Sequence, residues 1–238
     1  MQSRPENEDS EKNNTGSQMG HYDLKKSHSY LLYGFTVSGL IALIVVLAII
    51  DPDTRDILIQ EDGPIEALSA IGYFVCLIPL LRHKETDAES LFCIAVFLMI
   101  FGMRELDFHA RFTTMSMTKI EFYVSPHVPI FEKMIGVAVF VLLCYCFIYL
   151  SKKYLLAYVQ AVKRLEAYAI GVSLSFLFVM ISLGLDGLEK KAAKYGYAYA
   201  NQLIEITTVI EEVVELGVPV MFLIAILTYF NSSDIPST

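Results

Sequence analysis

Long runs without an acidic or basic residue constrain the fold of this chain more than any other feature of its sequence. The clearest are Ser29–Ile50 and Ile135–Leu150, which contain only uncharged residues and are strongly apolar. A helix needs about 20 such residues to cross a hydrocarbon core of roughly 30 Å. Hydrophobic residues also make up 55% of the 238 residues, more than a water-soluble helical core of this size needs. The sequence therefore predicts an all-α, polytopic membrane protein.

Six spans are expected, because turn residues and charges separate six apolar segments. Pro52 closes the first span and Pro64 opens the second, since proline is tolerated in a first turn and disfavoured inside a helix. The predicted spans are 29–50, 64–81, 90–110, 133–150, 168–188 and 203–230. They would form a six-helix transmembrane bundle, the membrane domain 29–230, between a disordered polar N-terminal tail (1–28) and a C-terminal tail (231–238).

Basic residues near the span ends predict the orientation, because cytoplasmic loops carry an excess of lysine and arginine. Lys25, Lys26 and the basic residues after the second and fourth spans lie on one side, together with both termini. Both termini are therefore predicted to be cytoplasmic, in a bacterial cytoplasmic (inner) membrane.

The expected partners are the lipid bilayer and a second copy of this chain or another membrane protein. No nucleic acid is expected as a partner. The net charge of −8 says little about partners, because much of it lies in the N-terminal tail and the acidic helix ends.

The last span carries an unusual set of carboxylates. Glu205, Glu211, Glu212 and Glu215 precede the apolar segment 217–230. On a helix these four fall within about 120° of one another, and the segment after them rises only about 20 Å. Glu212 and Glu215 are therefore expected inside the bilayer or in a cavity within it, where each charge costs roughly 2.5–3.5 kcal/mol.

The number of spans predicts that these acids meet others. With six spans, the start of the second, the ends of the third and fifth and the start of the sixth share one side, and charged residues gather at each place. The predicted metal or proton site contains Asp62, Glu66, Glu105, His109, Glu211, Glu212 and Glu215. Arg104 is the candidate ion-pair partner or anion-binding residue.

An oxygen-rich set of this kind favours a divalent cation, namely Mg²⁺, Ca²⁺ or Mn²⁺, with Zn²⁺ or iron as second choices because of His109. Without a cation, the carboxylates would share protons. Glu105 and His109 are four residues apart, so they are expected on one helix face. In the plainer interpretation, Asp107 and Arg111 form a helical ion pair and His109 is a hydrogen-bonded core residue.

Two further stretches bear on the site. The string EDGPIEAL at the entrance to the second span, followed by GMRELDFHARF, resembles bacterial multi-pass membrane proteins without an established activity. Those proteins combine an EDG-x-x-E helix entrance with an acid-bearing third span and a glutamate-rich last span.

The apolar loop 113–133, which lies on the same side as the predicted site, is a candidate lid over it. Pro126 and Pro129 break any long helix in this loop.

Three functions fit these patterns. The first is transport of an ion or small solute, because intramembrane acids facing a cavity are typical of ion and proton paths. The second is a metal-dependent hydrolase or transferase acting on a lipid or lipid-linked phosphate, with Glu105 or Glu212 as the candidate catalytic base. The third is a non-catalytic membrane assembly subunit whose acids bind a basic helix of a partner.

Overall fold

The computed structural model describes residues 7–60, 63–83, 87–117, 119–188 and 201–233, with side chains except at 7–26, 109–110, 201–202 and 232–233. Every element in these ranges is a helix, which confirms the all-α prediction for them. Six are long: α1 (Asn7–Ile49), α3 (Pro64–Arg82), α4 (Ala88–Glu105), α7 (Ile130–Lys163), α8 (Ala167–Leu185) and α10 (Asn201–Ser233). Three are short: α2 (Pro52–Ile59), α5 (Phe108–Arg111) and α6 (Ile120–Val124).

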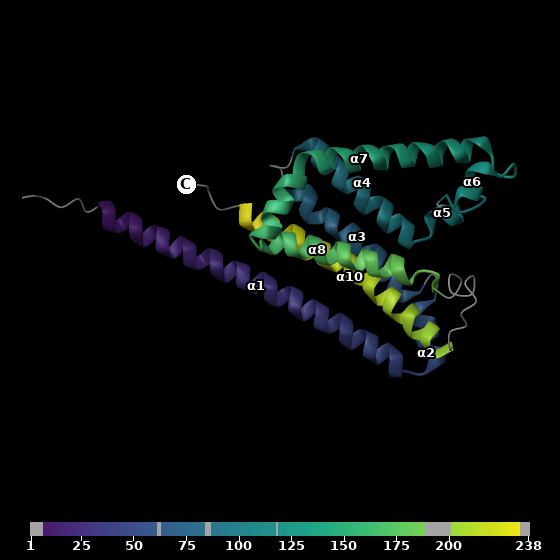
Figure 1. The fold of residues 1–238 in the computed structure, drawn as a ribbon, viewed down its shortest axis with the longest axis horizontal. Helices are drawn as coiled ribbons and strands as arrows, with labels where there is room; N and C mark the ends of the chain where they lie inside the picture. The colour runs from purple at the N-terminus through teal and green to yellow at the C-terminus, as the bar shows by residue number, and fades with distance from the viewer. Residues whose placement is uncertain (1–6, 61–62, 84–86, 118, 189–200, 234–238) are drawn as a thin grey trace, which may run out of the picture.

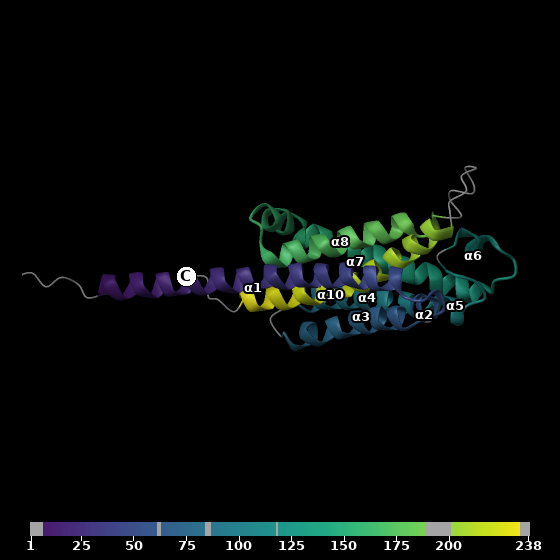
Figure 2. The same ribbon diagram turned by 90° about the horizontal axis from the view of Figure 1, so that it is seen from below.

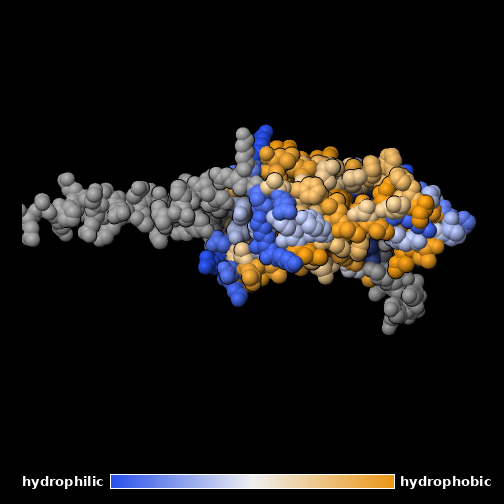
Figure 3. Space-filling view, turned by 90° about the horizontal axis from the view of Figure 1, so that it is seen from above, coloured by the Kyte–Doolittle hydropathy of each residue, from blue (hydrophilic) through white to orange (hydrophobic). Residues whose placement is uncertain are grey.

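The helices identify an integral membrane protein by their length and composition. In the part of the chain that the structure describes, the stretches long and apolar enough to cross a membrane are Ser27–Ile49, Pro52–Arg82, Ile130–Lys163, Ala167–Leu185 and Leu203–Asn231. The helix α4 is not among these five, because three of its 18 residues are charged. Figure 3 shows a broad apolar band between two more polar ends of the molecule. The count of six spans and the cytoplasmic placement of both termini stay predictions.

The central helix is α10. It packs against α8, α3 and α1, and α3 in turn packs against α4. Figures 1 and 2 show α1 and α8 running alongside α10, while α7 lies at the periphery. Half of the apolar stretch of α10 (50%) is buried, against 11% of that of α7. Side chains of α10 therefore meet those of three other helices.

The third long helix ends earlier than the sequence predicted. The chain turns after Glu105, because Asp107 has a φ of 46°, in the left-handed region that a right-handed helix cannot contain. Residues 108–111 form a separate short helix, α5. Glu105 and His109 therefore do not share a face of one helix, although their spacing had predicted that they would.

Two other boundaries also differ from the expectation. The helix of the fourth predicted span does not end at Lys152 and Lys153, since α7 continues to Lys163 without a break; the bounds of the span itself stay a prediction. At the N-terminus, α1 begins at Asn7, inside the segment for which a disordered tail was expected. The division of the chain at residue 28 stays a prediction.

Candidate functional site

Three helices converge on the carboxylate of Glu215 in α10. The hydroxyl of Ser182, near the end of α8, donates a hydrogen bond of 2.6 Å to Glu215 Oε1. The guanidinium of Arg104, near the end of α4, donates through Nη2 to the same oxygen at 3.3 Å. Arg104 Nη1 also lies 3.8 Å from Glu105 Oε1. One arginine thus links two glutamates that come from different helices.

A small cavity lies beside these groups. Its volume is about 20 Å³, and a cavity needs roughly 10–15 Å³ to hold one water molecule. The lining residues come from α3, α4, α8 and α10: Tyr73, Arg104, Glu105, Val179, Ser182, Leu183, Glu215 and Val218. The cavity therefore has a polar wall made by the glutamates, the arginine and the serine, and an apolar wall made by the valines and the leucine.

Burial differs sharply among the charged side chains. The side chain of Glu105 is 5% exposed and that of Glu215 is 16% exposed, whereas Arg104 is 46% exposed. Two carboxylates are thus largely enclosed by protein, while nearly half of the side-chain surface of the cation that they share is left uncovered by it. Among the described residues, Arg104 is the basic side chain that pairs with both of them.

Other glutamates surround this group. Glu66 in the first turn of α3 and Glu215 both act electrostatically on Glu105. Glu212 interacts electrostatically with four carboxylates, those of Glu66, Glu105, Glu211 and Glu215. We call these five glutamates the carboxylate cluster. Five of the seven residues of the predicted metal or proton site thus interact electrostatically, and contacts through Arg104 join two of them, Glu105 and Glu215.

The remaining two predicted site residues cannot be placed in the cluster. Asp62 lies outside the described residues, and the side chain of His109, in α5, is also outside them. Among the described residues, no group of three or more histidine, cysteine, aspartate and glutamate side chains is arranged to hold a metal ion. The divalent cation therefore stays a prediction.

Glu205, the first acid of the stripe in α10, has a different partner. Its carboxylate forms an ion pair with Arg55 of α2, in which Arg55 Nη2 lies 3.1 Å from Glu205 Oε2. The side chain of Arg55 is 9% exposed. Arg55 also contacts Asp56 at 3.3 Å. This pairing ties α2 to the start of α10 and separates Glu205 from the carboxylate cluster.

The candidate lid packs on the start of α7. The ring of Phe122 in α6 is fully buried, and Glu132 accepts hydrogen bonds of 2.8 Å and 3.0 Å from the amide and hydroxyl of Thr114. Pro126 and Pro129 lie in the turn between α6 and α7. None of the cavity-lining residues belongs to this segment, so a closure over the cavity stays a prediction.

Ser182 and Tyr73 are cavity residues that sequence reasoning missed. Both are uncharged and stand in apolar helices, so charge patterning gave no signal for them. One signal was present for the serine: Ser175 and Ser182 are seven residues apart, about two turns, and lie on one face of α8. Both are buried in the structure.

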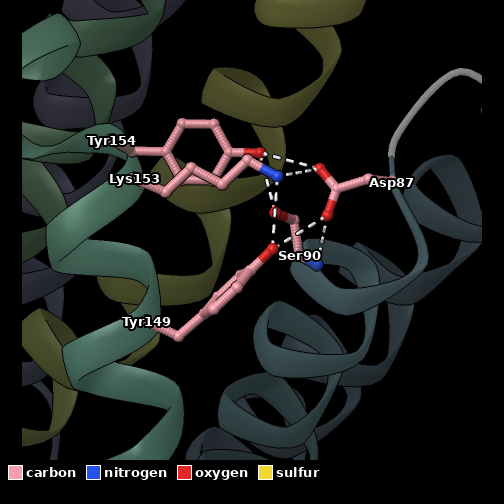
Figure 4. Close-up of polar contacts among 5 residues, drawn as sticks. All are labelled: Asp87, Ser90, Tyr149, Lys153 and Tyr154. Carbon is pink, nitrogen blue, oxygen red and sulfur yellow. Dashed lines mark hydrogen bonds and ion pairs between the residues drawn. The ribbon is translucent and has the colours of Figure 1, made fainter.

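A second polar network lies at the other end of α4 (Figure 4). Asp87 caps α4 by accepting a 2.9 Å hydrogen bond from the amide of Ser90. The ammonium of Lys153, in α7, also donates to Asp87, as does the hydroxyl of Tyr149 at 3.1 Å. The ammonium of Lys153 and the Ser90 amide hold the pKa of Asp87 well below its ordinary value. This network fastens the start of α4 to α7.

Searches against known protein families, characterised proteins and solved structures found no match to this chain. The function is therefore argued from the carboxylate cluster and the cavity beside it.

Proposed function

We propose that this integral membrane protein binds a cation or protons at the carboxylate cluster and uses that binding to transport an ion or a small solute. The observation that supports the proposal is the burial of Glu105 and Glu215 around a single shared arginine, beside a cavity that admits water. Glu105 is the last residue of α4 and Glu215 lies in the interior of α10, within an apolar stretch where charge is costly.

The charge balance of this group favours a bound positive charge. Two carboxylates and one guanidinium leave a net negative charge, and Glu212 adds to it because its electrostatic neighbours are other carboxylates. An uncompensated charge in a poorly hydrated site is strongly unfavourable, so such groups take up a proton or a cation. Uptake at one side of the membrane and release at the other would constitute transport.

Flux in proteoliposomes tests the proposal. Glu215→Gln keeps the size of the side chain and its hydrogen-bond acceptor but removes its charge, so we expect at least a tenfold loss of cation or proton flux. Glu105→Gln should act in the same direction. Glu205→Gln is the matched control, because it changes a glutamate of the same helix that pairs with Arg55 outside the cluster. Equal flux in all four proteins would contradict the proposal.

A second candidate is the metal-dependent enzyme acting on a lipid or lipid-linked phosphate. The half-exposed guanidinium of Arg104 beside the buried acids favours it, since such a group can bind a phosphate bidentately. Metal analysis of the purified protein beside Glu212→Gln/Glu215→Gln separates the two candidates. The enzyme requires a bound metal that the double variant loses, and equal metal content in both proteins would exclude this role for the cluster.

A further inference from the structure

The hydroxyl of Tyr73, in the middle of α3, lies at the cavity without a hydrogen bond. The residue is 4% exposed and is one of the cavity-lining residues. Its hydroxyl interacts electrostatically with Glu105, Arg104 and Glu215, but no hydrogen bond joins it to another described residue. Because a buried hydroxyl without a partner costs free energy, this one indicates a ligand in the cavity.

Glu105 is a second buried group at the cavity without a hydrogen bond. Its side chain is 5% exposed, and its contact with Arg104, at 3.8 Å, is longer than a hydrogen bond allows. No hydrogen bond joins its carboxylate to another described residue. Glu215 accepts its hydrogen bonds from Ser182 and Arg104 through the same oxygen, Oε1. Oxygens of both glutamates and of Tyr73 are therefore available to a ligand.

Helix α10 adds a backbone oxygen in the turn that carries Glu215. Pro219 has no amide hydrogen, so the carbonyl of Glu215 lacks its usual donor within the helix. Glu215 and Val218, both in this turn, line the cavity. The proline fits against Gly72 of α3, where a Cβ would lie only 2.9 Å from the proline ring. Carbonyls that membrane helices leave without a donor supply ion ligands in several transporter folds.

We infer that the cavity binds one sodium ion without its hydration shell, with Tyr73, Glu105 and Glu215 as ligands, and we call these three residues the sodium site. This inference rests on the proposed function and names the transported ion. The cavity volume of about 20 Å³ admits one body of the size of a water molecule. A sodium ion without its hydration shell is no larger than that.

Charge balance favours a monovalent over a divalent cation. Glu105 and Glu215 carry two negative charges and Arg104 carries one positive charge, so one monovalent cation makes this group neutral. The other three glutamates of the carboxylate cluster are not among the lining residues. A divalent cation would leave a positive charge in a poorly hydrated site. Mg²⁺ and Ca²⁺ also need six or more oxygen ligands, and Mg²⁺ keeps several waters that a cavity of this volume cannot hold.

The two simpler occupants each leave one of these features unexplained. A water molecule would give the Tyr73 hydroxyl a partner, but it would leave the negative charge uncompensated. A proton on Glu105 would balance the charge, but it would leave the cavity unfilled and the Tyr73 hydroxyl without a ligand. A sodium ion accounts for the volume, the charge and the available oxygens together.

Binding of radioactive sodium to the purified protein in detergent tests the sodium site. Tyr73→Phe removes one ligand oxygen and keeps the ring, which lies 5.9 Å from that of Phe101, so we expect at least a tenfold loss of sodium affinity. Tyr33→Phe is the matched control, because Tyr33 is equally buried and is not among the cavity-lining residues. Its sodium affinity should equal that of the unmodified protein.

Arg104→Gln tests the charge balance. Without the guanidinium, two carboxylates remain at the cavity, and a divalent cation would make the group neutral. We therefore expect Ca²⁺ to compete with radioactive sodium at least tenfold better in Arg104→Gln than in the unmodified protein. Choline chloride at the same ionic strength is the control, because choline is too large for the cavity. An unchanged preference in Arg104→Gln, or equal competition by choline, would contradict the sodium site.

The remaining outcomes separate this inference from the proposed function. If the unmodified protein binds no sodium but shows proton flux that Glu215→Gln abolishes, the sodium site is wrong and the proposed function stands. Equal sodium affinity in Tyr73→Phe and the unmodified protein, or an equal loss in Tyr73→Phe and Tyr33→Phe, would also overturn the site. If sodium binds as expected and Glu215→Gln changes no flux, the site stands as a binding site and the proposed transport fails.

Discussion

At the scale of single residues, Glu215 shows how an acid is kept inside an apolar helix. Its Oε1 accepts from Ser182 and from Arg104, so part of the solvation lost on burial is replaced by two donors. Glu105 lacks such a hydroxyl donor among the described residues and faces the same arginine at the longer distance of 3.8 Å. The two acids are therefore not equivalent in the donors that compensate their burial.

Close packing at single glycines gives a prediction about stability. Gly171→Ala would place a Cβ within 2.7 Å of the Tyr33 ring, so we expect a loss of about 1–3 kcal/mol in the free energy of unfolding, as is typical of an overpacked core. Thermal unfolding in detergent micelles measures the effect. Gly184→Ala is the control on the same helix, because nothing lies within 4 Å of its Cβ position. This second variant should be neutral or more stable by up to about 1 kcal/mol.

At the scale of helices, the network around Asp87 gives a pH-dependent prediction. Its pKa in the folded protein is lowered by Lys153 and the Ser90 amide. The stability that the carboxylate contributes is therefore fully present above the ordinary aspartate pKa of about 4 and is lost as the pH falls further. Asp87→Asn, which still caps α4, should lower the unfolding midpoint at pH 7 and have a shrinking effect below pH 4.

The control for this prediction is Glu89→Gln on the same turn of α4. Glu89 is exposed and accepts a hydrogen bond of 3.0 Å from Tyr145, not from Lys153. Its replacement should change the midpoint less at pH 7. A midpoint difference between Asp87→Asn and the unmodified protein that persists unchanged at strongly acidic pH would show that the ion pair with Lys153 is not its source.

Sequence reasoning predicted the long helices from their apolar runs and missed how several of them end. The run 133–150 is part of α7, but Lys153 could not be read as an interior residue, because its partner Asp87 is 66 positions away. Asp107 ends α4 through a left-handed φ that spacing rules do not show. In the site, the positions of the charges indicated Arg104, Glu105 and Glu215, which the structure joins through the arginine, and the larger site stays a prediction. Ser182 carries no charge, so that hydrogen bond required the structure.

At the scale of the whole molecule, the arrangement of helices depends on whether α4 crosses the membrane. Its 18 residues rise about 27 Å, close to the roughly 30 Å of the hydrocarbon core. Its last turn carries Arg104 and Glu105 into the same end of the bundle as Glu66 and Glu215. A crossing by α4 therefore explains how acids from α3, α4 and α10 reach one place.

Side-specific labelling tests this arrangement. If α4 crosses together with the five more apolar stretches, both chain ends lie on one side of the membrane and the segment between α5 and α6 lies on the other. His28→Cys and Asn231→Cys place single cysteines at the outer ends of the first and last apolar stretches, at positions that protein does not cover. These cysteines should then react with a membrane-impermeant thiol reagent from the same side, and Thr114→Cys only from the opposite side. The single cysteines are introduced into a protein whose four native cysteines are replaced with serine or alanine.

Labelling of His28→Cys and Asn231→Cys from opposite sides would require an odd number of crossings and would leave α4 at the membrane surface. The carboxylate cluster would then lie at an interface, where water would solvate its charge without a transported ion.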